Sequence, residues 1–497
     1  MPASILCFGD VIALSNNLIN GSIEEYKFYK KTEKSGRTGK EEDFSLFGAL
    51  PYGGIIVFEL RAKRFKGLSD VNLVILKDSV PEGAKDAEKN GFPLSIYSVD
   101  GENDIYRVEI PTDRLLSGKE SGLFFYYYEA DSFDGRIQLA GEQATELLPL
   151  EAAGKRQFLI YKGDFTTPDF FKSGTVYHIF VDRFRSSGRC KLKDGARLNP
   201  DWKNGIPEYP EYRGEPLKNN EFFGGDLYGI IEKLDYLLSI GITVIYLSPI
   251  FESVSNHKYD TADYMKVDSM FGGDEAFLML CEECGKRGIS VILDGVFNHT
   301  GDDSIYFNRY GHYNTLGAYN SKDSEYYDWY FFTDFPNKYE CWWGIDILPK
   351  VNCSNKKYRE FILGENGVIR KYMKMGASGY RLDVADELPD DFIKGIRDAV
   401  KDEKKDGIVL GEVWEDASNK IAYGMRKEYL GGSELDSVMN YPLRTGIINY
   451  IKYGDFSGLR YATETIYRHY PKCVSDCLMN FLGTHDTERI LTVLGGD

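Results

Sequence analysis

GYRLDVADEL, residues 379–388, is a strand-like apolar run that carries two opposite charges two positions apart. Alternate side chains of a β-strand point to the same face, so Arg381 and Asp383 are predicted to project together, opposite Leu382 and Val384. A charged pair on an inward face is costly to bury unless its members are paired or used in chemistry. Taken alone, the pair fits a structural ion pair as well as a functional site.

The surrounding region alternates between strands and helices from about residue 170 onward. The predicted strands are 176–184, 243–250, 290–299, 378–386, 408–414, 436–443 and 479–486. Amphipathic helical runs lie between them, for example 227–241, 274–288 and 358–376. This alternation is typical of a parallel sheet, and the number of strands favours an α/β fold of the (β/α)₈ TIM-barrel type over an open sheet.

Two further regions complete the predicted organisation. Residues 1–165 contain β-rich runs separated by Gly, Asp and Ser turns, which predicts an N-terminal antiparallel β-sandwich ahead of a catalytic barrel at 170–497. The aromatic run 122–131 fits a sheet core better than a sugar-stacking face, because aromatic residues are common in strands. Residues 300–350, rich in Tyr, Trp, Asn and Asp, form a long insertion after the third barrel strand, and loops of that length are usually functional.

Polar residues recur at the C-terminal ends of the predicted barrel strands. They are Asp294, Asn298, His299, Arg381, Asp383, Glu412, His485 and Asp486. Barrel active sites are built at that face from several strands. Asp383 therefore belongs to a ring of acids that converge on one mouth, which favours the functional interpretation of the opening pair.

A ring of carboxyl groups suits glycosidic bond cleavage, which needs one ionised and one protonated carboxyl group. Arg381 is expected to lower the pKa of Asp383 and keep it ionised, which suits a nucleophile. Glu412 lies among apolar neighbours in GEVW, a setting that suits the acid/base. Asp486 is a third acid that could stabilise positive charge on the sugar ring.

Several of these residues also have structural interpretations. Asp294 could contact substrate or simply hold Arg381, and Asn298 fits a turn residue better than a metal ligand. Trp414 could be core or a sugar platform, and Tyr259 could pack a loop or face a sugar, since aromatic faces are large and rigid.

Composition excludes some classes of function. The net charge of −17 disfavours a nucleic-acid or anionic-membrane partner, because both attract basic surfaces. The eight cysteines form no disulfide framework, and the CxxC at Cys281 and Cys284 has no second pair at zinc spacing, so we expect no metal site there. The N-terminus has no basic region before its short apolar run, so we expect no signal peptide, no membrane span and a cytoplasmic location.

Four ordered segments resemble the signature regions of the α-amylase family, glycoside hydrolase family 13. They are DGVFNH (294–299), GYRLDVADE (379–387), GEVW (411–414) and FLGTHD (481–486). LPKVN (348–352) and DSVMNYPLR (436–444) are similar to the neopullulanase, cyclomaltodextrinase and maltogenic amylase subfamily, in which an N-terminal sandwich also precedes the barrel. The resemblance covers about residues 170–497.

The resemblance implies specific roles. It implies Asp383 as nucleophile, Glu412 as acid/base and Asp486 as transition-state stabiliser, and makes 300–350 the family's domain B. The substrate-binding residues would be Arg381, His299, His485, Asp294, Tyr259, Trp414 and Glu387. No cofactor is required. A structural calcium stays open, because the loop at 185–202 lacks the Asn/Asp-dense calcium stretch of many relatives.

The resemblance predicts a retaining hydrolase of α-1,4-glucosidic bonds in maltooligosaccharides, starch, cyclodextrins or pullulan. The alternatives are a transglycosylase of the same family and a non-catalytic glucan-binding protein. Glu415 and Asp386 depart from residues that relatives often carry, which leaves linkage preference open. A homodimer through the N-terminal domain is also compatible with the family. Only TERILTVLGGD follows Asp486, so we expect a fragment or a sheet closed in another way.

Overall fold

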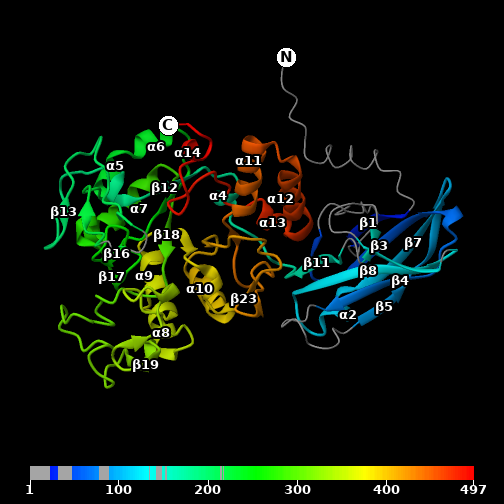
Figure 1. Ribbon diagram of the computed structural model, residues 1–497, viewed down its shortest axis with the longest axis horizontal. Helices are drawn as coiled ribbons and strands as arrows, with labels where there is room; N and C mark the ends of the chain where they lie inside the picture. Colours follow the sequence, from blue (N-terminus) through cyan, green and yellow to red (C-terminus); the bar gives the residue numbers. More distant parts are fainter. Residues whose placement is uncertain are drawn as a thin grey trace, which may run out of the picture. The chain divides into compact units, whose positions relative to one another are not determined.

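The protein is described by a computed structural model that covers residues 23–31, 48–77, 89–133, 135–140, 148–150, 154–212, 215 and 218–496 (Figure 1). The chain divides into two compact units. The first comprises Met1–Phe165, Ser418–Gly432 and Thr445–Ser475, and the second comprises Thr166–Ala417, Ser433–Arg444 and Asp476–Asp497. The first unit therefore includes two segments from late in the sequence.

The first unit contains two sheets that face a common apolar core. One sheet has the order β1 (Ile23–Lys31), β3 (Ile55–Lys63), β7 (Asn103–Pro111) and β6 (Ser95–Asp100), all antiparallel. The other is built around β8 (Gly122–Ser132), which pairs with β4 (Ser69–Lys77), β9 (Gly135–Ala140) and β11 (Arg156–Tyr161). The remaining elements are β2 (Ala49–Pro51), β5 (Lys89–Pro93), β10 (Leu148–Pro149), η1 (Arg64–Lys66) and α2 (Thr112–Leu116).

The alternation of β8 explains its aromatic run. Phe124, Tyr126 and Tyr128 point into the core between the sheets, where Phe124 stacks on Phe158 with ring centroids 5.2 Å apart. Tyr127, on the other face, packs in a separate small apolar cluster. The interpretation of this run as sheet core is therefore confirmed.

Two segments from late in the sequence, Ser418–Gly432 and Thr445–Ser475, complete the first unit, and the former is hydrogen-bonded to β11 and the residue that follows it. They contain β23 (Ile421–Ala422), β24 (Met425–Arg426), α12 (Phe456–His469) and α13 (Lys472–Ser475). Gln157 donates to Ser418 over 2.8 Å and accepts from Asn419 over 2.7 Å. The backbone N–H of Lys162 donates to the Gly431 carbonyl over 3.1 Å.

The second unit contains a parallel sheet whose strands follow chain order, as in a TIM barrel. The strands are β12 (Val176–Ile179), β15 (Val244–Leu247), β18 (Ser290–Gly295), β21 (Gly379–Leu382), β22 (Ile408–Gly411) and β25 (Ser437–Val438). Their nearly continuous Val, Ile and Leu content suits strands buried on both faces. The predicted strand at 479–486 is reduced to one parallel bridge, from Met479 to Met439.

The helices of the second unit have some boundaries that differ from the predicted ones. They are α4 (Asp169–Lys172), α5 (Leu227–Glu232), α6 (Leu234–Ser239), α7 (Gly273–Lys286), α8 (Lys356–Leu363), α9 (Val368–Lys374), α10 (Asp390–Glu403) and α14 (Ile490–Val493), with short turns η2 (Val181–Arg183), η3 (Ser269–Phe271) and η6 (Ala385–Glu387). The helix α11 (Tyr441–Tyr453) begins in the second unit, and its residues from Thr445 onward belong to the first. The predicted helices at 227–241 and 358–376 each divide in two, the second around Gly364 and Gly367. The predicted strand at 436–443 stops at Val438 because Tyr441 begins α11.

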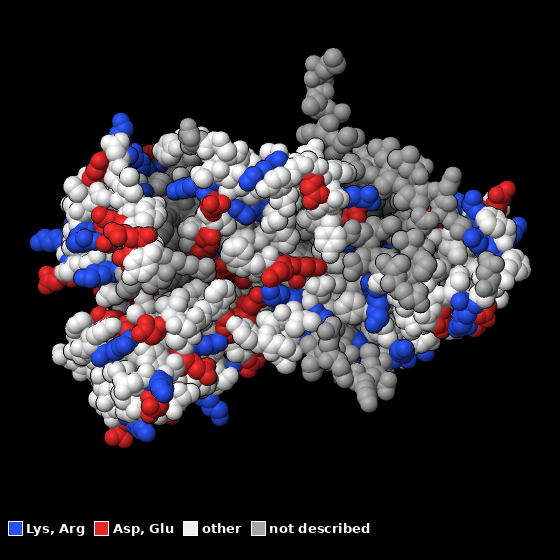
Figure 2. All heavy atoms as spheres, in the orientation of Figure 1, with Lys and Arg blue, Asp and Glu red and all other residues white. Residues whose placement is uncertain are grey.

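The loops at the C-terminal ends of the strands carry their own short elements. These are β13 (Arg197–Leu198), β14 (Glu221–Phe222), β16 (Phe251–Ser253), β17 (Thr261–Val267), β19 (Phe332–Asp334), β20 (Lys338–Tyr339), η4 (Tyr327–Trp329) and η5 (Trp342–Gly344). The insertion after β18 has an aromatic centre, in which Phe307 contacts Tyr330 and Tyr339 with centroids 4.9 and 4.8 Å apart. On the face shown in Figure 2, acidic and basic side chains are interspersed.

Candidate active site

Strand register brings the central polar residues side by side. Asp294 on β18 is in register with Arg381 on β21, and Arg381 is in register with Leu410 on β22, two residues before Glu412. Asp383 follows immediately after β21. The C-terminal ends of three neighbouring parallel strands therefore supply the acids and the arginine, as the sequence predicts.

Arg381 is the centre of the cluster and is completely buried. Its Nη1 lies 2.9 Å from Asp294 Oδ1 and 2.9 Å from Asp383 Oδ1. Its Nη2 lies 3.0 Å from Glu412 Oε2 and 3.9 Å from Asp486 Oδ2. One guanidinium thus holds four carboxyl groups from four segments of the chain, and the shared face predicted for Arg381 and Asp383 is confirmed.

The protonation of the cluster differs from the sequence expectation. Burial raises the pKa of the Asp383 carboxyl well above its usual range, and the neighbouring Glu412 adds to the rise, although Arg381 opposes both. The expectation of a lowered pKa for Asp383 is therefore wrong, because burial outweighs the single cation. Burial likewise raises the pKa of Asp486 to about 6. A cluster of four acids around one arginine favours retaining a proton, which glycosidic cleavage requires.

Tyr259 and His485 extend the cluster on the side of Asp294. The Tyr259 hydroxyl donates to Asp294 Oδ2 over 2.9 Å and lies 2.6 Å from His485 Nε2. Burial lowers the pKa of His485 to about 3, so its ring is neutral at pH 7. Because the hydroxyl hydrogen goes to Asp294, His485 Nε2 must carry the ring proton, and this nitrogen also lies 3.3 Å from Asp486 Oδ2.

Glu412 is held by the residues around it. Its Oε2 accepts the backbone N–H of Val384 over 2.8 Å, and its Oε1 accepts the Trp414 indole N–H over 3.1 Å. Val384 has φ of +41°, which is rare for a β-branched residue and is typical of functional sites. Trp414 stacks on Tyr441 with centroids 3.9 Å apart and keeps 46% of its surface exposed, so it is available to a ligand rather than core.

His299 and Glu387 both contact the insertion at residues 300–350. His299 is 1% exposed, and burial lowers its pKa to about 4. Glu387 forms an ion pair of 2.7 Å with Lys350, whose backbone bridges His299. The LPKVN segment (348–352) therefore contacts His299, the histidine predicted to face the sugar.

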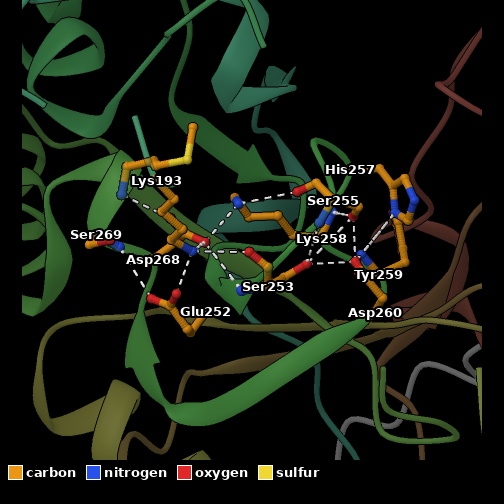
Figure 3. Close-up of polar contacts among 11 residues, drawn as sticks. Lys193, Glu252, Ser253, Ser255, His257, Lys258, Tyr259, Asp260, Asp268 and Ser269 are labelled. Atoms are coloured by element: carbon orange, nitrogen blue, oxygen red, sulfur yellow. Dashed lines mark hydrogen bonds and ion pairs between the residues drawn. The ribbon is translucent and has the colours of Figure 1, made fainter. Parts of the chain in front are cut away.

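A buried polar network lies beneath the loop that presents Tyr259 (Figure 3). Lys258 Nζ lies 2.7 Å from Asp268 Oδ2, and Lys193 Nζ lies 2.5 Å from the same oxygen. Burial alone would raise the pKa of Asp268, but the two ammonium groups outweigh it and the pKa is lowered. Ser253 donates to Asp260 Oδ1 over 2.5 Å, which closes the loop on itself. The ammonium groups of Lys193 and Lys258 thus both bind Asp268 and anchor this loop.

Sequence reasoning missed two residues of the site. Tyr246, fully buried on β15, donates its hydroxyl to Asp294. His178 on β12 stacks on Tyr246 with centroids 4.5 Å apart and lies 5.0 Å from the His485 ring. In the sequence, each of these residues could have been recognised as a side chain with a polar group inside an otherwise apolar strand.

The described residues contain no group of three His, Cys, Asp or Glu side chains placed to hold a metal ion. Lys193, in the loop after β12, places its ammonium group next to Asp268, as Lys258 does. Cys281 and Cys284 are buried on α7, and burial raises the pKa of the Cys284 thiol to about 12, which makes it a poor nucleophile.

Among the described helices, none combines the length and the apolar character needed to cross a bilayer.

The chain is similar in sequence to proteins of known family. Residues 178–497 match the family model described as alpha amylase, catalytic domain. The chain is 41% identical to an amylopullulanase of Thermoanaerobacterium saccharolyticum, over 90% of this chain and 37% of that protein. It is 36% identical to neopullulanase 2 of Thermoactinomyces vulgaris, over 67% of this chain and 53% of that protein.

Solved structures show the same likeness. The cyclic α-maltosyl-(1→6)-maltose hydrolase of Arthrobacter globiformis is 33% identical, with a TM-score of 0.57, over 67% of this chain and 70% of that chain. A cyclomaltodextrinase is 25% identical, with a TM-score of 0.58, over 89% of this chain and 70% of that chain. The chain spans little more than a third of the amylopullulanase and about half of the neopullulanase.

Proposed function

The chain belongs to the α-amylase family, and from this premise we propose that it carries the catalytic centre of a retaining glycosidase that cleaves α-1,4-glucosidic bonds of α-glucans. The observation that carries the proposal is the position of Arg381 between Asp383 and Glu412. The relatives named amylopullulanase and neopullulanase support α-glucans as the substrate class.

Burial raises the pKa of Asp383 in the free enzyme, so the reactive form is the one in which Asp383 is ionised and the proton of the cluster lies on Glu412. In the proposed reaction Asp383 then attacks the anomeric carbon while Glu412 gives its proton to the departing glycosidic oxygen. The C–O bond to the leaving sugar breaks as the bond to the Asp383 carboxylate forms. Glu412, now ionised, then takes a proton from water, whose oxygen displaces Asp383 and restores both groups. Arg381 holds Asp383 Oδ1 in place, which leaves Oδ2 as the attacking atom, and Asp486 stabilises the positive charge that develops on the ring.

Transglycosylation is the second candidate, because a sugar hydroxyl can replace water in the last step. The exposed Trp414, stacked on Tyr441 beside Glu412, favours it by offering an acceptor sugar an aromatic face next to the acid/base. A non-catalytic glucan-binding protein would have no need for all three acids around one arginine.

A product profile on starch, pullulan and cyclodextrin tests the proposal, with maltotriose added to detect longer oligomers. Hydrolysis by the parent chain and its loss in Asp383→Asn would support it. Equal product release by both proteins would overturn it. Longer oligomers from maltotriose would establish transglycosylation.

A cytoplasmic location forms part of the proposal and is supported by 35% identity to the intracellular maltogenic amylase of Bacillus subtilis. A homodimer through the N-terminal domain stays a prediction.

A further inference from the structure

A stack of aromatic rings leads from the candidate active site to the surface of the insertion. The His299 ring stacks on Trp342 with centroids 5.5 Å apart and planes 28° apart. Trp342 stacks in turn on Trp343, at 5.4 Å and 23°. His299 is 1% exposed whereas Trp343 is 80% exposed, so the stack runs from the buried site into solvent.

Trp343 is held in this exposed position at a cost. Its backbone has φ of +50° and ψ of +28°, the left-handed region, which is unfavourable for a residue with a Cβ. The exposed indole also forgoes the burial that makes large aromatic side chains stabilising. Strain of this kind persists where the surroundings impose it, and it clusters at ligand sites.

The surroundings of Trp343 do impose it. The backbone N–H of Trp342 donates to the Leu348 carbonyl over 3.0 Å, and the Trp342 carbonyl accepts from the backbone N–H of Ile345 over 2.9 Å. Asp346, in the same turn, pairs with Arg309 at 3.2 Å. The turn is therefore built to present the indole, and it is closed by contacts that do not involve the ring itself.

Two polar atoms along the stack have no hydrogen-bond partner among the described residues. They are His299 Nε2 and Trp342 Nε1, and both are buried. A buried polar group without a partner is destabilising, so native proteins usually satisfy such groups. A ligand that offers hydroxyl groups beside a flat apolar face would satisfy both the nitrogens and the rings.

Pyranose rings have this chemistry, since their C–H faces are apolar and their edges carry hydroxyls that both donate and accept. Accordingly, building on the proposed function, we propose that Trp343 is a platform for an α-glucan unit beyond the one that His299 faces. It is a specificity-determining residue that favours longer oligosaccharides. Ile345 and Ile347, which follow Trp343 in the sequence, are each 40% exposed.

Binding can be measured apart from turnover in the full chain that carries Asp383→Asn. Isothermal titration with maltotriose and with maltohexaose gives the length preference of this background. Trp343→Ala is expected to weaken maltohexaose binding about tenfold, the factor that corresponds to about 1.4 kcal/mol of stacking, and to leave maltotriose within about twofold. Trp343→Phe should retain most of the preference.

Tyr236→Ala is the matched control. Tyr236 is 53% exposed on α6, which leads toward the N-terminal end of β15, the end of the sheet opposite the acids. Maltohexaose binding that is unchanged in Trp343→Ala, or lowered equally in Tyr236→Ala, would overturn the platform. If the Asp383→Asn chain binds neither sugar, the proposed function fails, and the platform fails with it.

Discussion

Lys258 places its ammonium 2.7 Å from the carboxylate of Asp268, and neither side chain has any exposed surface. Lys193 shares the same oxygen, so Asp268 balances two cations beneath the loop that presents Tyr259. Removal of one member of a buried pair leaves an uncompensated charge, which is far more damaging than loss of a surface pair.

Asp268→Asn should therefore lower the free energy of unfolding by about 3–5 kcal/mol, measured by urea denaturation. Lys394→Met is the control, because both members of its ion pair with Asp398 are more than half exposed, and its loss should change stability by less than about 1 kcal/mol. Similar effects of the two substitutions would show that Asp268 does not anchor the loop.

Asp383→Asn should abolish turnover, with kcat lowered about 10⁴-fold or more, while the protein stays folded. Burial raises the pKa of Asp383, so a neutral amide at this position suits the folded state at pH 7 better than a carboxylate does. Melting temperature and kcat measured on the same preparation check both parts. Activity close to that of the parent chain would assign the nucleophile to another group.

Glu412→Gln should slow maltooligosaccharides more than activated aryl maltosides, because an aryl leaving group needs less protonation. The expected difference between the two substrates is about 10²-fold or more. Comparison of kcat on both substrates is the measurement. If both slow by the same factor, Glu412 is not the general acid.

Asp486→Asn should raise stability at pH 7.5 more than at pH 4. The pKa of Asp486 is raised to about 6 from 3.8, so the folded state binds its proton more tightly than the unfolded state does. Its contribution is therefore present below pH 4 and is lost as the pH rises through 6. Melting temperatures at the two pH values test the sign, and kcat should fall about 10²–10³-fold.

The buried histidines predict the opposite trend in acid. The pKa of His299 is lowered from 6.5 to about 4, so between these values the unfolded state binds more protons and stability falls with falling pH. His299→Gln should reduce the loss of melting temperature between pH 6.5 and 4. A loss identical to that of the parent chain would mean that His299 does not titrate as its burial requires.

The sequence predicts the site best where local geometry decides it. The two-residue period of a strand places Arg381 and Asp383 on one face, and the parallel register then brings Asp294 and Glu412 to the same end of the sheet. The segment near Met479 kept only one bridge, since strand pairing depends on neighbours that the segment itself does not specify.

The degree of burial in the acid cluster and the unusual backbone conformations could not be predicted from the sequence. The pKa of Asp383 depends on how much water the assembled cluster excludes, so its direction could not be obtained from the adjacent Arg381 alone. Likewise, the residue types Trp343 and Val384 do not predict a left-handed backbone, because the surrounding contacts impose that conformation.

The composition of the first unit has a consequence for the timing of synthesis. Ser418–Gly432 and Thr445–Ser475 belong to that unit, with hydrogen bonds from the first of these segments to Gln157 and Lys162 on or beside β11. The ribosome reaches Ser475 about 310 residues after Phe165, which takes roughly 15–60 seconds at 5–20 residues per second. The early strands of the first unit are therefore synthesised well before the later segments that complete the unit.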